Sequence, residues 1–471
     1  MQRLYLAELR DSWPAWLGVS LAFVVANLSF ANSALVLASG LEAVAQGRLA
    51  MESSAEFTLS PISNFVFSGL VALVVIATSA SMVIDSRRGS LARLALAGAS
   101  PAQVTRTVML QLVVVAFACA VVADIIAVAT LNPYLHFLTV GTESGLSIEQ
   151  PAPVYNIGGM VLANLGVVGV AVLGGYGQAR RAAAIPPVEA LRQASAAPPG
   201  RVRIIGWVGV ALALGIIAVM FAAVPVIAGF AGKETVSTYM QMSLGALVVF
   251  IIAVALAAPA LISPLARGWT ALIPSRDPVW QLARKNIYVR GARFTRSVVP
   301  IIFTIGLMLG LLSLGPTLYS TSVASGFEQT IQLDKAGMGA FLSLLGPALA
   351  IALAGGVGNL FMMSKQRDAE LALVGITGAT PNQRRLLPVL EAIILTVTAA
   401  IPAAAALGVM LGFLVVSFRA AALVPGIDVP ASAWLLGVGV TGLIMVAATF
   451  LPTLSGLRLP EPRVVARLAA E

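Results

Sequence analysis

Long apolar runs separated by short polar segments dominate the pattern of this 471-residue chain. Ten runs reach the length of about 20 residues that an α-helix needs to cross the hydrocarbon core of a bilayer. These runs are residues 15–37, 65–84, 105–131, 157–177, 204–230, 240–265, 298–318, 340–363, 386–416 and 433–451. The pattern therefore predicts an all-α polytopic membrane protein with ten transmembrane helices.

Basic residues follow the predicted spans with a regular alternation. Of the 29 Lys and Arg residues, 25 lie before the first span or around the ends of the second, fourth, sixth, eighth and tenth spans that face the same side. The other segments hold only Arg48, Lys233, Lys335 and Arg419. Because short cytoplasmic loops carry the excess of Lys and Arg, we expect both termini to lie in the cytoplasm.

The composition excludes a soluble globular protein. Hydrophobic residues make up 59% of the chain, charged residues 10%, and the mean hydropathy is +0.94, whereas charged residues usually make up about a quarter of a soluble domain. The net charge of +9 is explained by membrane topology, so we expect membrane lipids as partners and no nucleic acid.

The sequence contains no recognisable catalytic or metal site. Cys119 is the only cysteine, which excludes an internal disulfide, and His136 is the only histidine, which we interpret as a solvated loop residue. No phosphate-binding G-x-x-x-x-G-K-[ST] motif occurs, so the chain has no ATP site of this type. We predict a non-catalytic protein that binds no metal or cofactor of its own.

One stretch of the chain occurs twice, with a constant offset of 280 residues. We name residues 87–103 and 367–383 repeat segment 1 and repeat segment 2. Each segment predicts a short helix that ends at Gly98 or Gly378, where a left-handed backbone is favourable. Ser100 or Thr380 follows with Pro next and Gln three residues on, which predicts a capping box at the start of a new helix.

The repeat extends over most of the chain. When 280 is added to the residue numbers of the first four spans, the resulting ranges overlap the last four spans. This offset predicts two four-helix units in parallel orientation, joined by a central two-helix hairpin that has no counterpart. The expected units are residues 1–200, 201–275 and 276–471.

The short helices of the two repeat segments are candidates for a paired docking surface. Small and apolar residues recur at helical spacing on one face, and charged residues occupy the other. A solvated loop and an interfacial helix on the lipid headgroups are the alternatives. The candidate residues are Arg87, Arg88, Leu91, Leu94 and Gly98 in the first copy, and Arg367, Glu370, Leu371, Val374 and Gly378 in the second.

Two acidic residues fall within predicted spans, where a carboxylate is costly and indicates function by default. Glu391 lies close in sequence to Arg384 and Arg385, so we interpret it as a paired and solvated interfacial residue, with a role in transport as the alternative. Asp124 lies deeper, and a functional role and structural pairing stay equally open.

The second copy resembles the hallmark of FtsX-like (MacB-type) ABC transporter permeases. It carries Arg367, Glu370, a Leu-rich turn, Gly378-Ala-Thr, Gln383 and then Glu391 in the next span. The first copy has Ser90 and Gln111 where the family has Glu. The ten-span plan is similar to the bacitracin-export type, except that a large extracellular domain is lacking.

The resemblance implies the permease subunit of an ABC transporter in a bacterial inner (plasma) membrane. Two cytoplasmic ATPase subunits, which would hold ATP and Mg²⁺, would dock on the two repeat segments and drive export or extraction of a lipid, a peptide or an antimicrobial. The repeat segments would then act as the short cytoplasmic coupling helices of two FtsX-like units. Rival interpretations are a mechanotransmitter that acts on an extracytoplasmic protein, and a proton-coupled secondary transporter that uses Asp124 or Glu391. A membrane-embedded transferase has the least support, since no loop gathers the acids or metal ligands that it needs.

Overall fold

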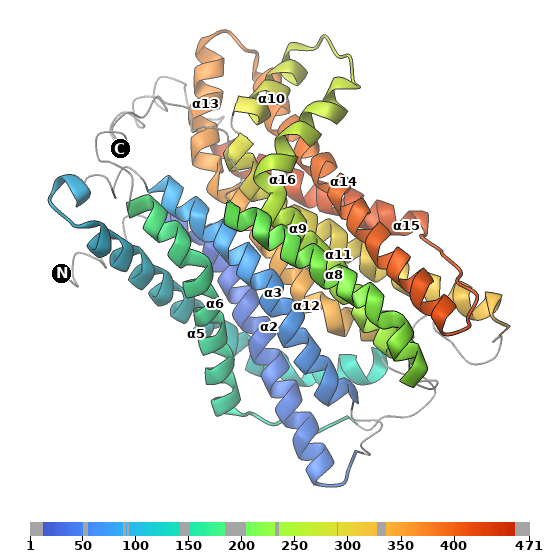
Figure 1. The fold of residues 1–471 in the computed structure, drawn as a ribbon. Helices are drawn as coiled ribbons and strands as arrows, with labels where there is room; N and C mark the ends of the chain where they lie inside the picture. The colour runs from blue at the N-terminus through green and yellow to red at the C-terminus, as the bar shows by residue number, and fades with distance from the viewer. Residues whose placement is uncertain are drawn as a thin grey trace.

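The computed structural model describes residues 13–49, 55–87, 91, 94–141, 150–183, 204–230, 235–289, 291–326 and 336–456. Helices account for nearly all of these residues, and the described ranges contain no strand. The helices are α2 (Trp13–Ala45), α3 (Ala55–Ser86), α5 (Pro101–Gly141), α6 (Ile157–Ala183), α8 (Ile204–Phe230), α9 (Thr235–Ala271), α10 (Pro278–Val289), α11 (Gly291–Ala324), α12 (Ala336–Met362), α13 (Ser364–Ile376), α14 (Pro381–Ala420), α15 (Ala431–Trp434), the π-helix η1 (Leu435–Val440) and α16 (Thr441–Gly456) (Figure 1).

The prediction of an all-α chain with ten membrane-spanning helices is confirmed. Ten helical segments of the described chain are long and apolar enough to cross a membrane, and each overlaps one predicted run. The two longest helices are α5, with 41 residues, and α14, with 40. At about 1.5 Å per residue each is roughly 60 Å long, so both extend beyond the hydrocarbon core.

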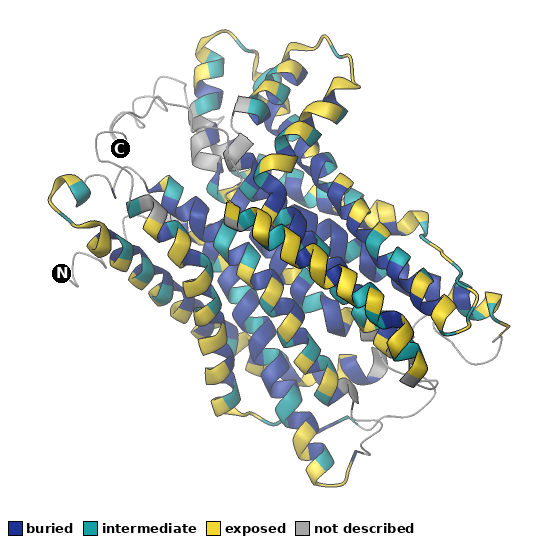
Figure 2. Ribbon diagram, in the orientation of Figure 1, coloured by how far each residue is buried: buried dark blue, intermediate teal, exposed yellow. Residues whose placement is uncertain are grey.

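The first four spans form one bundle and the last four another. Helices α2, α3, α5 and α6 pack against one another, as do α11, α12, α14 and α16. The two bundles meet where α12 packs against α2 and α3, and buried residues fill this centre (Figure 2). The chain is therefore a single helical body around a shared apolar core.

Equivalent positions of the two bundles meet in the α3–α12 contact. Val75 of α3 lies directly against Gly355 of α12, and these residues are separated by the repeat offset of 280. Nearer the start of both helices, the side chain of Asn64 donates a hydrogen bond to the backbone oxygen of Ser343 at 3.5 Å. The two helices thus run in the same direction, as expected for parallel repeats.

The hairpin of α8 and α9 packs mainly against the second bundle, and α9 also contacts α3 of the first. Helix α9 packs against α11 and α14, and α8 packs against α9 and α14. Gly310 of α11 makes room for Leu247 of α9, whose Cδ2 atom would lie 2.6 Å from an added Cβ. Pro402 and Ala406 of α14 are buried, whereas their equivalents on α5, Val122 and Ile126, are exposed.

Three hydroxyl groups at the end of α11 and just after it hold the loop between α14 and α15. Thr317, Thr321 and Ser325 are spaced four residues apart, and each hydroxyl exchanges hydrogen bonds with the backbone of one loop residue. The bonded residues are Asp428, Gly426 and Val424, with oxygen–oxygen or nitrogen–oxygen distances of 3.0–3.5 Å. We name this arrangement the hydroxyl clamp; it lies at the end of the bundle opposite to α13.

Candidate functional site

Both repeat segments form the turn that the sequence predicts. Gly98 has φ +92° and Gly378 has φ +99°, the left-handed conformation that ends a helix. The backbone N–H of Ser100 donates to Gln103 Oε1 at 2.8 Å, and the backbone N–H of Gln103 donates back to the Ser100 hydroxyl at 3.3 Å. The Thr380–Gln383 pair repeats this geometry at 2.9 and 3.3 Å. The two capping boxes are therefore confirmed.

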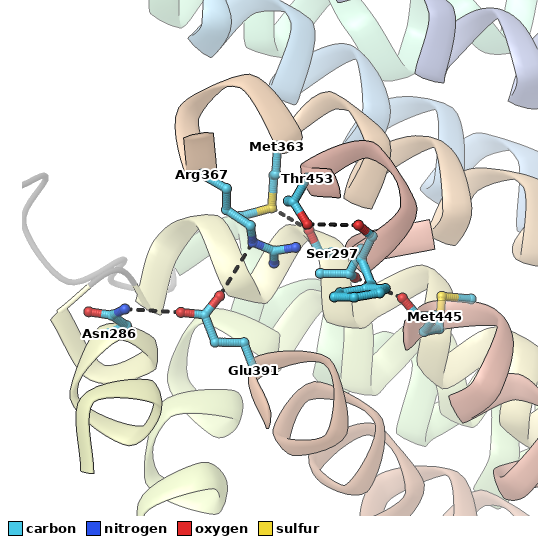
Figure 3. Close-up of polar contacts among 9 residues, drawn as sticks. Asn286, Ser297, Met363, Arg367, Glu391, Met445 and Thr453 are labelled. Atoms are coloured by element: carbon cyan, nitrogen blue, oxygen red, sulfur yellow. Dashed lines mark hydrogen bonds and ion pairs between the residues drawn. The ribbon is translucent and has the colours of Figure 1, made fainter. Parts of the chain in front are cut away.

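The second repeat segment is tied to its neighbours by a buried ion pair (Figure 3). Arg367 of α13 places its Nε atom 3.3 Å from Glu391 Oε2 of α14, and both side chains are only 5% exposed. The side-chain amide of Asn286, on α10, donates to the other carboxylate oxygen of Glu391 at 3.0 Å. One carboxylate thus connects three helices at the α13 end of the bundle.

The first repeat segment has a neutral version of the same contact. The Arg87 guanidinium donates through Nη1 to Gln111 Oε1 at 2.6 Å, and both residues are buried. Arg87 also lies over the ring of Trp16 on α2, 5.7 Å from its centroid, a cation–π geometry. Arg87 and Gln111 are the equivalents of Arg367 and Glu391 at the offset of 280. Both repeats therefore anchor the start of their segment to the next span.

These contacts correct two expectations. The interpretation of Glu391 as a solvated carboxylate is wrong, because its side chain is buried and pairs with Arg367 from a different helix. Arg87 and Arg367, expected on a charged docking face, are buried as well. Their burial makes them anchors of the repeat segments, and other residues must form the accessible surface.

The remaining candidate residues divide between the buried side and the accessible side. Leu91 and Leu371 are buried, Leu94, Glu370 and Val374 are partly buried, and Gly98 and Gly378 are exposed. Arg88 lies outside the described residues. Sequence reasoning missed the exposed apolar residues Leu96 and Ile376, which are 54% and 59% exposed. Their equivalence at the offset of 280 was a signal that could have identified them.

An ion pair links the two bundles beside the repeat segments. Arg296 at the start of α11 pairs with Asp85 near the end of α3, two residues before Arg87. The position equivalent to Arg296 in the first bundle is Trp16, which contacts Arg87 instead. The two repeats are thus similar in backbone but differ in charge.

Asp124 does not lie near the repeat segments. It is on α5, where its Oδ2 atom accepts a hydrogen bond of 2.8 Å from the side-chain amide of Asn164 on α6. Within the described ranges, no group of three or more His, Cys, Asp or Glu side chains is placed to hold a metal ion. The repeated and anchored segments are therefore the strongest candidate for a functional site in this part of the chain.

Comparison with known families identifies one domain in the chain. Residues 62–187 match the family model described as FtsX-like permease C-terminal. The chain contains an FtsX-like permease domain. No curated protein matches the chain.

The matched FtsX-like domain includes repeat segment 1, its anchor pair Arg87 and Gln111, and Asp124. Its equivalents at the offset of 280 are residues 342–467, which include repeat segment 2. The ten spans indicate a multi-pass membrane protein, and the FtsX-like domain suggests the permease subunit of an ABC transporter. Subunits of this kind are typically non-catalytic and work with separate ABC ATPases.

Proposed function

We propose that this chain is an ABC transporter permease whose two repeat segments receive a separate dimer of ATPase subunits in the cytoplasm. The observation that carries this proposal is the duplicated, anchored turn. Two copies of one backbone motif lie at the ends of two equivalent helices, each fixed by a buried Arg to the following span. Such a pair suits a partner that has two equivalent subunits.

The charge pattern supports a cytoplasmic location for this end of the bundle. The 25 basic residues of the alternating segments include those of both repeat segments, and basic residues mark cytoplasmic loops. Both termini then lie in the cytoplasm, and the hydroxyl clamp lies on the outer side of a bacterial inner membrane.

Leu96 and Ile376 supply the proposed contact with the two ATPase subunits. Exposed apolar side chains at the tip of a helix can fill a groove in a partner, and interface energy concentrates in such residues. ATP and Mg²⁺ would be held by the partner subunits. The chain itself would supply two permease units, residues 1–200 and 276–471, with the hairpin of residues 201–275 attached to the second.

The buried anchors give a path for transmitting movement. A displacement of α13 would be transmitted to α14 and α10 through the contacts of Glu391 with Arg367 and Asn286. A push on repeat segment 1 reaches α5 through Gln111 and α2 through Trp16. Because both anchors are buried, the segments and spans move together. The moved cargo would be a hydrophobic or amphiphilic substrate that is exported or extracted from the membrane.

Substitution of the two exposed apolar residues, Leu96 and Ile376, tests this function. The native complex would be purified in lipid nanodiscs, and its ATPase content and ATPase activity measured. The double variant Leu96→Asp and Ile376→Asp should lose the ATPase subunits, with affinity reduced by about 30-fold or more for a loss of about 2 kcal/mol. Ile427→Asp, an equally exposed apolar residue in the opposite-end loop, serves as the matched control. An unchanged ATPase content in the double variant would refute the proposal.

A further inference from the structure

Asp124 and Asn164 form a polar pair within the apolar part of two adjacent spans. Asn164 lies seven residues after the start of α6 at Ile157, which is about 10 Å along the helix. The pair therefore lies in the half of the bundle that is farther from α13, which is the outer leaflet in the proposed orientation.

Each side chain of this pair has an oxygen atom without a donor. The Asn164 amide nitrogen donates to Asp124 Oδ2, but Asp124 Oδ1 and Asn164 Oδ1 are both buried and accept no hydrogen bond. Asn164 itself is only 9% exposed. Two unsatisfied acceptors side by side in an apolar region are unfavourable, and a ligand with several N–H donors would satisfy both.

The described helices around the pair provide no positive charge at its depth. Helices α2, α3, α6 and α12 pack against α5. Their other acids, Glu42, Glu56 and Asp85, and the basic residues Arg106, Arg180 and Arg181 all lie toward helix ends. Arg106 is 18 residues before Asp124, about 27 Å away along α5. Ionisable side chains within membrane spans usually have polar or charged partners, and a cationic ligand would supply one here.

The pair adjoins the lipid-facing surface of the bundle. Next to Asp124, Ile125 is 67% exposed, and next to Asn164, Leu165 is 59% exposed. Neither helix of the α8–α9 hairpin, which packs against α11 and α14, is among the helices that contact α5 or α6. Ala404 and Ile444 are the equivalent residues in the second bundle, so the polar pair belongs only to the uncovered half.

We propose that Asp124 and Asn164 form an intramembrane binding site for the ammonium group of an amphiphilic amine that enters sideways from the lipid. The ammonium would donate to Asp124 Oδ1 and Asn164 Oδ1, while the ligand's apolar chain lies along the exposed faces of α5 and α6. Access requires these helices to part, and α5 begins at the capping box of repeat segment 1. As an assignment of substrate class, the inference rests on the proposed transport function.

Direct binding to the purified permease in nanodiscs of neutral lipid tests the site without any ATPase. The probe is a fluorescent alkyl chain that ends in a primary amine, compared with its N-acetylated analogue of the same length. We expect the permease to bind the amine at least 10-fold more tightly than the neutral analogue. Asp124→Asn, which preserves shape and removes the charge, should abolish this preference, and Asn164→Leu should weaken it.

Glu42→Gln is the matched control, since it removes an exposed carboxylate from α2 of the same bundle and should retain the preference. Equal binding of amine and neutral analogue by the unmodified permease would overturn the proposal and identify Asp124 as a protonated structural residue. An undiminished preference in Asp124→Asn would overturn it as well. Either result leaves the docking of ATPase subunits untouched, because that proposal is tested by the Leu96 and Ile376 variants.

Discussion

Gly18 of α2 and Gly358 of α12 bring the backbones of the two bundles into direct contact. A Cβ atom on Gly358 would collide with the backbone oxygen of Gly18, and a Cβ on Gly18 would collide with that of Gly358. Glycine permits this approach because it has no side chain, and close backbone contact is a common means of helix association in membranes. The close approach of α2 and α12 therefore depends on these two glycines, because a side chain at either position would collide with the opposite backbone.

Gly358→Ala should lower the stability of the permease by about 1–3 kcal/mol, the usual cost of overpacking, because a backbone oxygen cannot move aside as a side chain can. Thermal unfolding of the purified protein in nanodiscs measures this effect. Gly408→Ala is the control: nothing lies within 4 Å of an added Cβ there, and Ala favours a helix by up to about 1 kcal/mol over Gly. A Gly358→Ala protein as stable as Gly408→Ala would contradict the close contact.

Removal of one member of the Arg367–Glu391 pair should be strongly destabilising. Glu391→Leu leaves a buried guanidinium without its carboxylate, which typically costs about 3–5 kcal/mol. Glu391→Gln should cost clearly less, because it converts the site into the Arg–Gln arrangement that Arg87 and Gln111 already form. Thermal unfolding compares the two variants, and Gln111→Leu extends the comparison to the first bundle. Equal losses for Leu and Gln at position 391 would show that the hydrogen bonds of this site contribute little.

Reversal of the Asp85–Arg296 pair should restore what each single substitution loses. Asp85→Arg or Arg296→Asp brings two like charges together near the end of α3, and both side chains are partly exposed, so we expect a loss of about 1 kcal/mol. The double variant recreates an ion pair of opposite polarity and should recover most of it. A double-mutant cycle from thermal unfolding gives the coupling energy. Strictly additive losses would mean that the two side chains do not interact in the membrane.

Loss of one hydroxyl should release the loop that the hydroxyl clamp holds. Thr321→Val keeps the shape of the side chain but removes both hydrogen bonds with Gly426. Amide hydrogen exchange of residues 424–428 should become about 10-fold faster, corresponding to about 1.4 kcal/mol. Ser322→Ala is the control, because the Ser322 hydroxyl bonds only to the backbone oxygen of Tyr319 in the same helix. Unchanged exchange in Thr321→Val would show that other contacts hold the loop.

Sequence patterns predicted those features that depend on local chemistry. The ten apolar runs, the left-handed glycines at 98 and 378, and the capping boxes at Ser100 and Thr380 were all correct, because each is determined by residues within one or two helical turns. The offset of 280 also predicted that equivalent helices would run in parallel, as the contact of Val75 with Gly355 shows.

Features that depend on distant residues were missed or wrong. The sequence associated Glu391 with nearby arginines, and it did not reveal the contacts with Arg367 and Asn286 from two other helices. Gly408 and Gly412 have the same four-residue spacing as Gly306 and Gly310. Nothing lies within 4 Å of an added Cβ at positions 408 and 412, whereas side chains of α9 lie directly against Gly306 and Gly310. Gly18 with Ala22 and Gly358 with Ala354 have the same four-residue spacing, and here the two glycines do make such a contact. Helical spacing shows which residues share a face, but the partner of that face is decided by tertiary packing.

The position of the α8–α9 hairpin has a consequence for where a substrate can enter the permease from the lipid. Among the described residues, α8 and α9 do not pack against α5 or α6, so in the proposed mechanism a molecule from the lipid would enter on the side of α5 and α6. Two equivalent ATPase subunits would therefore drive substrate entry at one side of the permease only. The second permease unit would stay rigid while α5 and α6 move apart.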